Sequence, residues 1–176
     1  PARHSCETSK MLFRGVRLGL RVVGTRRYST PGLTALKHLT INRVAPEATV
    51  GVREAVLWPG RPDMCQLAED EQGLHLAATL GDDQVIGVVS LFVDGAAARF
   101  RKFAVLEAHR GAGVGSRLLQ AAEAEAASAG AAHIGCDARA ETAAYYETRG
   151  YAAAGPPFAK YEGSEQLYAT MRKPLA

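Results

Sequence analysis

The residues best suited to chemistry in this sequence form a glycine-rich turn after Arg110. The run Arg110-Gly-Ala-Gly-Val-Gly-Ser116 places glycine at every second position. Because glycine has no Cβ, such a turn lets several backbone N–H groups approach one point. A helix that begins directly after the turn adds unpaired N–H groups and a partial positive charge. Together with the Arg110 guanidinium, the turn is suited to binding a pyrophosphate.

The same glycines permit two other interpretations. They could serve only to let a strand and a helix pack closely, or they could form a Rossmann dinucleotide site, for which Asp137 lies about 20 residues downstream, where a ribose-binding acid is expected. The Rossmann pattern, however, requires a third glycine where Ser116 or Leu118 stands. A P-loop is excluded because the chain contains no Gly-Lys-Ser/Thr.

A second segment, Ala144-Tyr-Tyr-Glu-Thr-Arg-Gly-Tyr151, follows at some distance. With this segment the chain resembles the GNAT acetyltransferase superfamily. Residues 110–115 match the Arg/Gln-x-x-Gly-x-Gly/Ala signature of that family, and residues 144–151 are similar to its Phe-Tyr-Glu-x-x-Gly-Phe segment. The two motifs lie in the family's order and spacing, and the resemblance covers about residues 39–172.

The resemblance implies acetyl-CoA as co-substrate and no metal. In the family, the central strand separates from its neighbour and the pantetheine arm of the coenzyme lies in the gap. The residues that would bind the coenzyme here are Phe103, Ala104, Val105, Arg110, Gly111, Ala112, Gly113, Val114, Gly115, Ser116, Asp137 and Tyr146. Many relatives have Asn at the position of Asp137, which as a carboxylate only accepts hydrogen bonds; it could instead cap the next helix.

The reaction implied by the resemblance is attack of a neutral amine on a thioester. The backbone N–H of Val105 would polarise the thioester oxygen. Tyr146 aligns with the family's general acid, although it could also be a core aromatic residue, and Tyr145 is the more structural of the pair. Glu107, His75 and Asp94 are weak candidates for the base, and none stands out. An alternative is a coenzyme-binding or regulatory module without catalysis.

The elements that must position these residues follow from hydrophobic periodicity and from turn residues. Strands are predicted at 39–45, 75–80, 84–93 and 98–106, helices at 46–58 and 113–129, and then a short strand at 134–137, a helix at 141–149 and strand-like runs at 151–159 and 166–172. This order predicts a mixed α/β (α+β) fold, with a mostly antiparallel sheet of six to seven strands flanked by about four helices. Residues 53–62, with Asp70 and His75, resemble a segment of one group of uncharacterised GNAT proteins, and in the family this region borders the acceptor pocket. The favoured interpretation of the segment is a helix end with a packed Trp58.

Charge divides the chain into two parts. The whole sequence carries +3, and residues 1–28, with seven basic residues and one acid, account for +6, which leaves −3 for the rest. We expect residues 1–38 to be a basic leader, cut after Tyr28 and typical of mitochondrial import, and 39–176 to be the acetyltransferase domain. The expected location is the mitochondrial matrix if the leader is a transit peptide, and the cytoplasm otherwise.

Composition narrows the classes of partner. A weakly acidic domain is a poor binder of nucleic acid. The sequence contains no run of about 18 apolar residues, so no membrane-spanning helix is predicted. The three cysteines are too far apart to form a disulfide framework or a metal cluster. These features argue against nucleic acid and a membrane as partners. The resemblance implies a small-molecule or peptide amine as acceptor, and we expect a monomer or homodimer.

Overall fold

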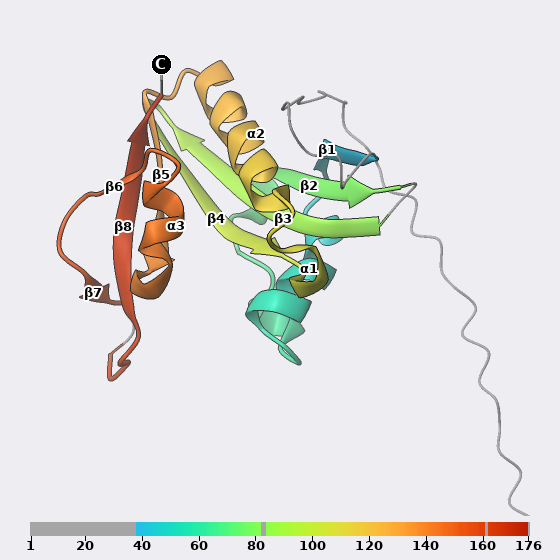
Figure 1. Ribbon diagram of the computed structural model, residues 1–176, viewed down its shortest axis with the longest axis horizontal. Helices are drawn as coiled ribbons and strands as arrows, with labels where there is room; N and C mark the ends of the chain where they lie inside the picture. The colour runs from blue at the N-terminus through green and yellow to red at the C-terminus, as the bar shows by residue number, and fades with distance from the viewer. Residues whose placement is uncertain (1–37, 82–83, 161, 176) are drawn as a thin grey trace, which may run out of the picture.

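The computed structural model describes residues 38–81, 84–160 and 162–175. Except for His38, the expected leader and its cleavage site lie outside the described residues. Figure 1 shows a twisted sheet crossed by helices. Its eight strands have the order β1-β2-β3-β4-β5-β8-β6, and β7 pairs with β8. They are β1 (Leu39–Val44), β2 (Leu74–Leu80), β3 (Gln84–Asp94), β4 (Ala97–Val105), β5 (His133–Arg139), β6 (Ala152–Ala153), β7 (Phe158–Ala159) and β8 (Leu167–Pro174).

Three α-helices lie in the described part of the chain: α1 (Glu47–Leu57), α2 (Val114–Ser128) and α3 (Ala143–Glu147). Four short 3-10 helices span Pro62–Met64, Asp70–Gln72, Glu107–His109 and Ala140–Thr142. Helices α2 and α3 cover one face of the sheet, where their apolar residues join the larger core cluster. Helix α1 covers the other face, on which Val52 packs with Val44, Val88 and Ala104.

The sheet opens between β4 and β5, which form its parallel pair. These strands are paired only at Ala97–His133, Ala98–Ile134 and Arg99–Gly135. Beyond Arg99, β4 continues to Val105 beside β3, whereas β5 continues beside β8. The strands therefore diverge at their carboxyl ends, the place where open α/β sheets bind ligands.

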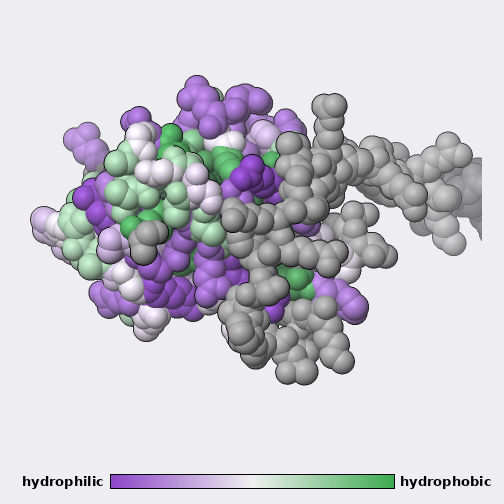
Figure 2. All heavy atoms as spheres, turned by 90° about the horizontal axis from the view of Figure 1, so that it is seen from above, coloured by the Kyte–Doolittle hydropathy of each residue, from purple (hydrophilic) through white to green (hydrophobic). Residues whose placement is uncertain are grey.

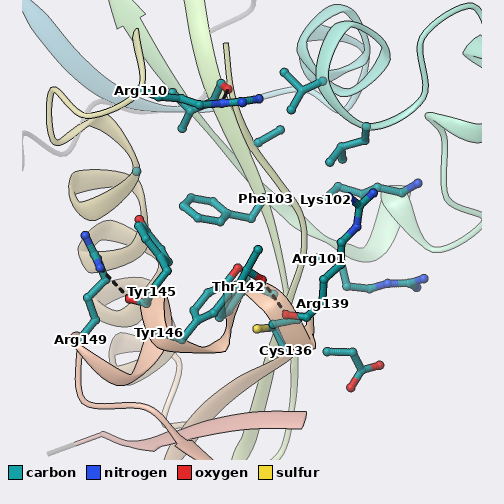
Figure 3. A pocket seen from close by; sticks show the side chains of 18 of the residues that line it. Arg101, Lys102, Phe103, Arg110, Cys136, Arg139, Thr142, Tyr145, Tyr146 and Arg149 are labelled. Atoms are coloured by element: carbon teal, nitrogen blue, oxygen red, sulfur yellow. Dashed lines mark hydrogen bonds between the residues drawn. The ribbon is translucent and has the colours of Figure 1, made fainter. Parts of the chain in front are cut away.

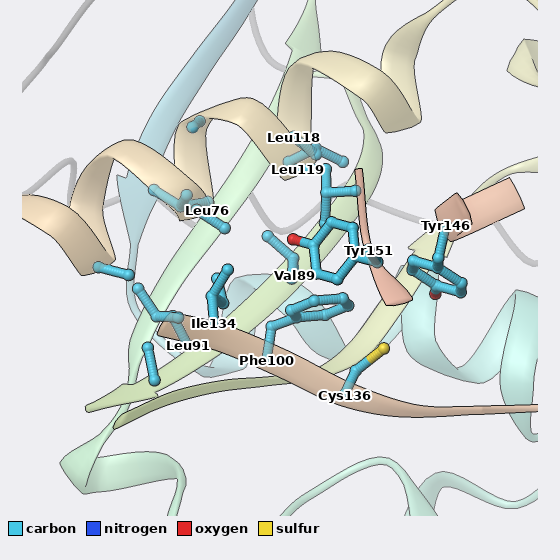
Figure 4. Packing of buried hydrophobic residues seen from close by; sticks show 14 of the residues in the cluster. Leu76, Val89, Leu91, Phe100, Leu118, Leu119, Ile134, Cys136, Tyr146 and Tyr151 are labelled. Atoms are coloured by element: carbon cyan, nitrogen blue, oxygen red, sulfur yellow. The ribbon is translucent and has the colours of Figure 1, made fainter. Parts of the chain in front are cut away.

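The main core lies between the sheet and α2. The faces of β2, β3 and β4 contribute Leu76, Val89 and Phe100, and α2 contributes Leu118 and Leu119, all at most 2% exposed. Figure 4 shows these side chains meeting the rings of Tyr146 and Tyr151, so the aromatic segment after β5 forms part of the core.

Helix α2 begins and ends at glycines. Gly113 precedes its first residue with φ +86°, and Gly130 follows its end with the same φ. Both angles lie in the left-handed region that favours glycine. On the sheet side, buried Glu125 pairs with Arg43 of β1, which fixes the helix across the edge of the sheet.

The observed architecture confirms the expected mixed, mostly antiparallel fold, with eight strands where six to seven were expected and, in the described residues, three α-helices where about four were expected. The predicted terminal runs differ in detail: 151–159 contains only the two-residue strands β6 and β7, separated by Gly155-Pro156-Pro157, because proline cannot donate to a strand ladder. No described helix is long and apolar enough to cross a membrane. The face in Figure 2 mixes hydrophilic and hydrophobic residues, with the hydrophilic ones mainly toward its rim.

Candidate active site

A cavity of about 1120 Å³ occupies the opening between β4 and β5. It is lined by the carboxyl-terminal half of β4, the glycine-rich turn, the end of β5, α3 and the end of α1. Sites for one small ligand measure roughly 300–1,000 Å³. The cavity therefore suits a large coenzyme together with part of a second molecule.

The glycine-rich turn lies at one end of this cavity. Gly111 and Gly113 have φ +74° and +86°, which lets the backbone fold tightly before α2. The N–H of Arg117 makes the first helical bond, to the Gly113 carbonyl at 3.1 Å. The N–H groups of residues 114–116 therefore have no acceptor within the helix, and they are available to an anion.

Two arginines without carboxylate partners flank this turn. Arg110 donates from Nε to the Val105 carbonyl (3.1 Å), and Arg149 donates to Ser116 Oγ (2.9 Å) and to the Tyr145 carbonyl (2.6 Å). The guanidinium of Arg149 also lies 3.6 Å from the centre of the Tyr145 ring. Because no described carboxylate forms an ion pair with either group, both charges fit the phosphates of a coenzyme.

Gly115 brings three elements into close contact. A Cβ at this position would lie 2.7 Å from the Tyr145 hydroxyl and 3.2 Å from Cζ of Phe103. Only glycine allows the first turn of α2 to approach β4 and α3 this closely, since real Cβ contacts are longer. All three residues line the cavity.

Tyr146 lies at the inner wall of the cavity, on α3. Its ring is 8% exposed and packs against Phe100, Phe103 and Tyr145. Burial, followed by the neighbouring Cys136, raises the pKa of Tyr146 well above its usual value. Burial likewise raises the pKa of Cys136 to about 12. Both groups thus keep their protons at neutral pH.

A β-bulge shapes the middle of β4. Val88 pairs with Ala104 and Ser90 with Arg101, so Lys102 and Phe103 together stand opposite Val89 alone. Lys102 has φ +51°, which is uncommon for a residue with a side chain. Phe103 and Val105 pack on the α2 side of the sheet, and Ala104 packs on the α1 side.

Asp137 is fully engaged at the end of β5. Its carboxylate accepts from Arg99 (2.5 Å), Lys160 (3.2 Å) and Thr170 (3.3 Å). The alternative role as a helix cap is wrong, because Arg139 and Thr142 precede the next two helices and neither helix has a side-chain cap. Asp137 instead joins β4, β5 and β8 at the cavity wall.

A buried polar network supports the wall on the α1 side. Arg53 is fully buried and donates to both carboxylate oxygens of Asp70, at 2.6 and 3.0 Å, and to Ser90 Oγ at 2.5 Å. His75 contacts Ser90 Oγ and the Asp70 carbonyl, each at 2.8 Å. The segment 53–75, interpreted from sequence as bordering the acceptor pocket, is thus held together by these contacts, and Trp58 lines the cavity.

The structure brings ten of the twelve expected coenzyme-binding residues to the cavity. The exceptions are Ala112 and Val114, which do not line it; Val114 is 1% exposed and lies in the core. The candidate bases Glu107, His75 and Asp94 do not line it either. Among the described residues, no group of three or more His, Cys, Asp or Glu could hold a metal ion.

Several residues that line the cavity were not singled out from the sequence. They are Arg99, Arg101, Lys102, Cys136, Arg139, Arg149 and Lys160. Arg149 falls at a variable position of the Tyr-Tyr-Glu-Thr-Arg-Gly segment, so the motif gave no signal for it. The basic run Arg99-Phe-Arg-Lys102 on a central strand was the available sign of the others, because charged residues there must face a cavity or pair.

Comparisons with known proteins agree with this geometry. The family model described as an acetyltransferase (GNAT) domain matches residues 61–171. The uncharacterised N-acetyltransferase YitI of Bacillus subtilis is 30% identical over 130 residues, covering 68% of this chain and 87% of that protein. A candidate N-acetyltransferase of Lactobacillus plantarum superposes with a TM-score of 0.71 at 26% identity, covering 80% of this chain and 100% of that one.

An aminoglycoside 6'-N-acetyltransferase crystallised with coenzyme A has the same fold, with a TM-score of 0.62 at 15% identity, covering 74% of this chain and 91% of that one. The match of the family model covers more than half of the chain, and it includes the glycine-rich turn, the opening between β4 and β5, and α3. The chain belongs to the GNAT acetyltransferase family, and the activity that this membership supports is acyl transfer.

Proposed function

We propose that this protein transfers the acetyl group of acetyl-CoA to an amine. One observation carries the proposal: the opening between β4 and β5 leads directly to the glycine-rich turn. Free helical N–H groups converge there with Arg110 and Arg149, neither of which has an acidic partner among the described residues. That arrangement fits the diphosphate of a coenzyme at one end and an extended arm along β4.

The residues around the opening match the parts of such a coenzyme. Residues 110–116 and Arg149 would hold the phosphates, and the backbone of Phe103, Ala104 and Val105 would face the pantetheine arm. Acetyl-CoA, when bound, supplies an acetyl group activated as a thioester. Residues 104 and 105 pair with β3, whereas the printed pairing of β4 with β5 ends at Arg99, so the β5-facing backbone groups beyond Arg99 are left for a ligand.

Two proton movements accompany the transfer. An alkylamine has a pKa near that of lysine, about 10.4, so its nitrogen must lose a proton before or during attack on the carbonyl carbon. As the C–N bond forms and the C–S bond breaks, the sulfur gains a proton. Tyr146 is the proposed donor, because it lines the cavity beside the opening and its hydroxyl is protonated at neutral pH.

Binding and turnover test the proposal separately. In isothermal titration calorimetry, acetyl-CoA is expected to bind and NAD is not. With a panel of primary amines, release of free coenzyme A, followed with a thiol reagent, should exceed the rate without amine. Binding without turnover on any amine would favour the non-catalytic module, and binding of NAD alone would contradict the site assignment.

A further inference from the structure

The cavity carries more positive charge than a coenzyme alone accounts for. Figure 3 shows Phe103 between two groups of side chains, with Tyr145 and Arg149 on one side and Arg101 and Lys102 on the other. The second, acceptor-side group of lining cations consists of Arg99, Arg101, Lys102, Arg139 and Lys160. It is separate from Arg110 and Arg149, which flank the glycine-rich turn.

Ion pairs neutralise only part of the acceptor-side group. Asp137 pairs with Arg99 and Lys160, Glu69 with Arg101, and Glu141 with Arg139 at 3.8 Å. Five cations therefore face three carboxylates, which leaves an excess of two positive charges. The proposed phosphate site lies with the other group, so this excess is available to the second substrate.

Lys102 is the cation of this group that has no carboxylate partner in the described chain. Its ammonium donates to the Met64 carbonyl at 2.7 Å and lies 5.3 Å from the centre of the Trp58 ring. Burial and the nearby charges of Arg53 and Arg101 lower the pKa of Lys102, so the site as it stands disfavours the cation. An anion beside it would offset both effects.

The backbone holds Lys102 in this place at a cost. Its φ of +51° lies in the left-handed region, which is unfavourable for a residue with a side chain and occurs where the surroundings impose it. The buried contacts of Arg53 with Cys65 and Asp70 fix the segment that carries Met64 and Glu69. Lys102 and Arg101 are thus positioned by the network instead of being free surface charges.

We propose that the acceptor amine carries a carboxylate, as amino acids do, and that Lys102 and Arg101 bind it. The inference rests on the proposed acetyl transfer and specifies its substrate class. Residues 29–176 carry −3, which taken alone would favour a cationic acceptor, but a ligand in the cavity experiences the nearby cations most strongly. Charge-assisted hydrogen bonds to ammonium and guanidinium groups are the strong ones, and they orient the amine toward β4.

Matched acceptors test the proposal without any variant. Acetyl transfer is measured to a series of amino acids, to their primary amides and to the corresponding decarboxylated amines. We expect kcat/KM for at least one free acid to exceed that of its amide and its amine by about tenfold or more, since a charged hydrogen bond is lost in both. Equal kcat/KM across every triplet would overturn the inference and leave acetyl transfer intact.

Variants then assign the carboxylate contact. Lys102→Met should raise KM for the preferred acid about tenfold and change KM for its amide less than twofold, whereas Lys102→Arg should keep most of the preference. Arg172→Met is the matched control, because it removes one positive charge from an exposed site on β8 outside the cavity. It should change neither value.

Two other results would contradict the proposed carboxylate contact. If Lys102→Met lowered kcat for acids and amides alike and left KM unchanged, Lys102 would act on the amine proton and the carboxylate contact would be wrong. If no amine of either kind accepted an acetyl group although acetyl-CoA bound, the proposed function and this inference would both fall. Thermal melts of each variant confirm that the comparison is between folded proteins.

Discussion

The ring of Tyr146 packs against the ring of Phe100, with their centroids 5.9 Å apart, and this contact joins α3 to β4. Phe100 belongs to the strand that opens the sheet, and it also meets Phe103 and Tyr151 edge to face. The hydroxyl of Tyr146 is thereby held at the cavity by a rigid aromatic cluster. The two roles weighed for Tyr146, core residue and acid, are therefore compatible.

Replacement of Tyr146 tests the acid role. Tyr146→Phe keeps the ring and its packing but removes the proton, so kcat at saturating substrates should fall about 100-fold or more, with KM for acetyl-CoA nearly unchanged. Tyr151→Phe is the control, because its hydroxyl donates to Glu123 at 3.0 Å and does not line the cavity. Equal kcat for wild type and Tyr146→Phe would remove the acid assignment.

The glycine-rich turn can be tested with two glycines of identical φ. Gly113→Ala and Gly130→Ala both place a Cβ at φ +86°, so each should cost about 1–2 kcal/mol of unfolding free energy. Only Gly113 lines the cavity, so only Gly113→Ala should weaken acetyl-CoA binding, by tenfold or more in calorimetry. The same loss of affinity in both variants would indicate a general effect of destabilisation.

The reactivity of Cys136 follows from its pKa, which burial raises from 9.0 to about 12. At pH 8 its thiolate fraction is then about a thousandfold below that of an ordinary thiol, so iodoacetamide should alkylate it far more slowly in the folded protein than in urea. Mass spectrometry of the Cys136 peptide gives both rates, and equal rates would contradict the assigned burial.

The pKa of Cys136 is higher in the folded than in the unfolded protein, so the thiol also contributes to the pH dependence of the unfolding free energy. This contribution is fully present below pH 9 and is lost as the pH rises toward 12.

The buried contacts of Arg53 with Asp70 and Ser90 should contribute strongly to the free energy of unfolding. Arg53→Met leaves the Asp70 carboxylate buried without its main partner, and breaking such a pair costs about 3–5 kcal/mol, measurable by urea denaturation. Arg61→Met, which breaks an exposed pair with Asp63, should leave the denaturation midpoint unchanged. Hydrogen bonds from Arg53 and the Leu67 N–H outweigh burial and lower the pKa of Asp70, so this stability should fade as the pH drops through the range below 4.

Import is a separate expectation that comes from the sequence alone. Residues 11–40 fused to a fluorescent protein are expected to enter mitochondria, because a basic segment without acids is drawn by the membrane potential. Replacing Arg14, Arg17 and Arg21 by glutamine should abolish entry, as judged by microscopy and by cleavage of the fusion. A wild-type fusion that stays in the cytosol would contradict the leader assignment.

Local patterns in the sequence predicted the ends of several helices and strands. The glycines before Val114 and at 130 mark both ends of α2, and β4 and α1 lie within a residue or two of their predicted bounds. Turn and helix-end signals act over a few residues, so they can be recognised without the rest of the fold. The region after Tyr151 was harder, since its short strands exist only through pairing with β8.

The mixed fold, the glycine-rich turn with Arg110, and Tyr146 on the segment after β5 could all be predicted from local patterns of residues. The contacts of Arg149 with Ser116 and of Asp70 with Arg53, and the place of Lys102 in a bulge beside Trp58 with no carboxylate partner in the described chain, became known only from the folded structure. These contacts join residues on different elements, up to 44 positions apart. Their geometry depends on how the sheet and helices pack, which no local pattern of residue types encodes.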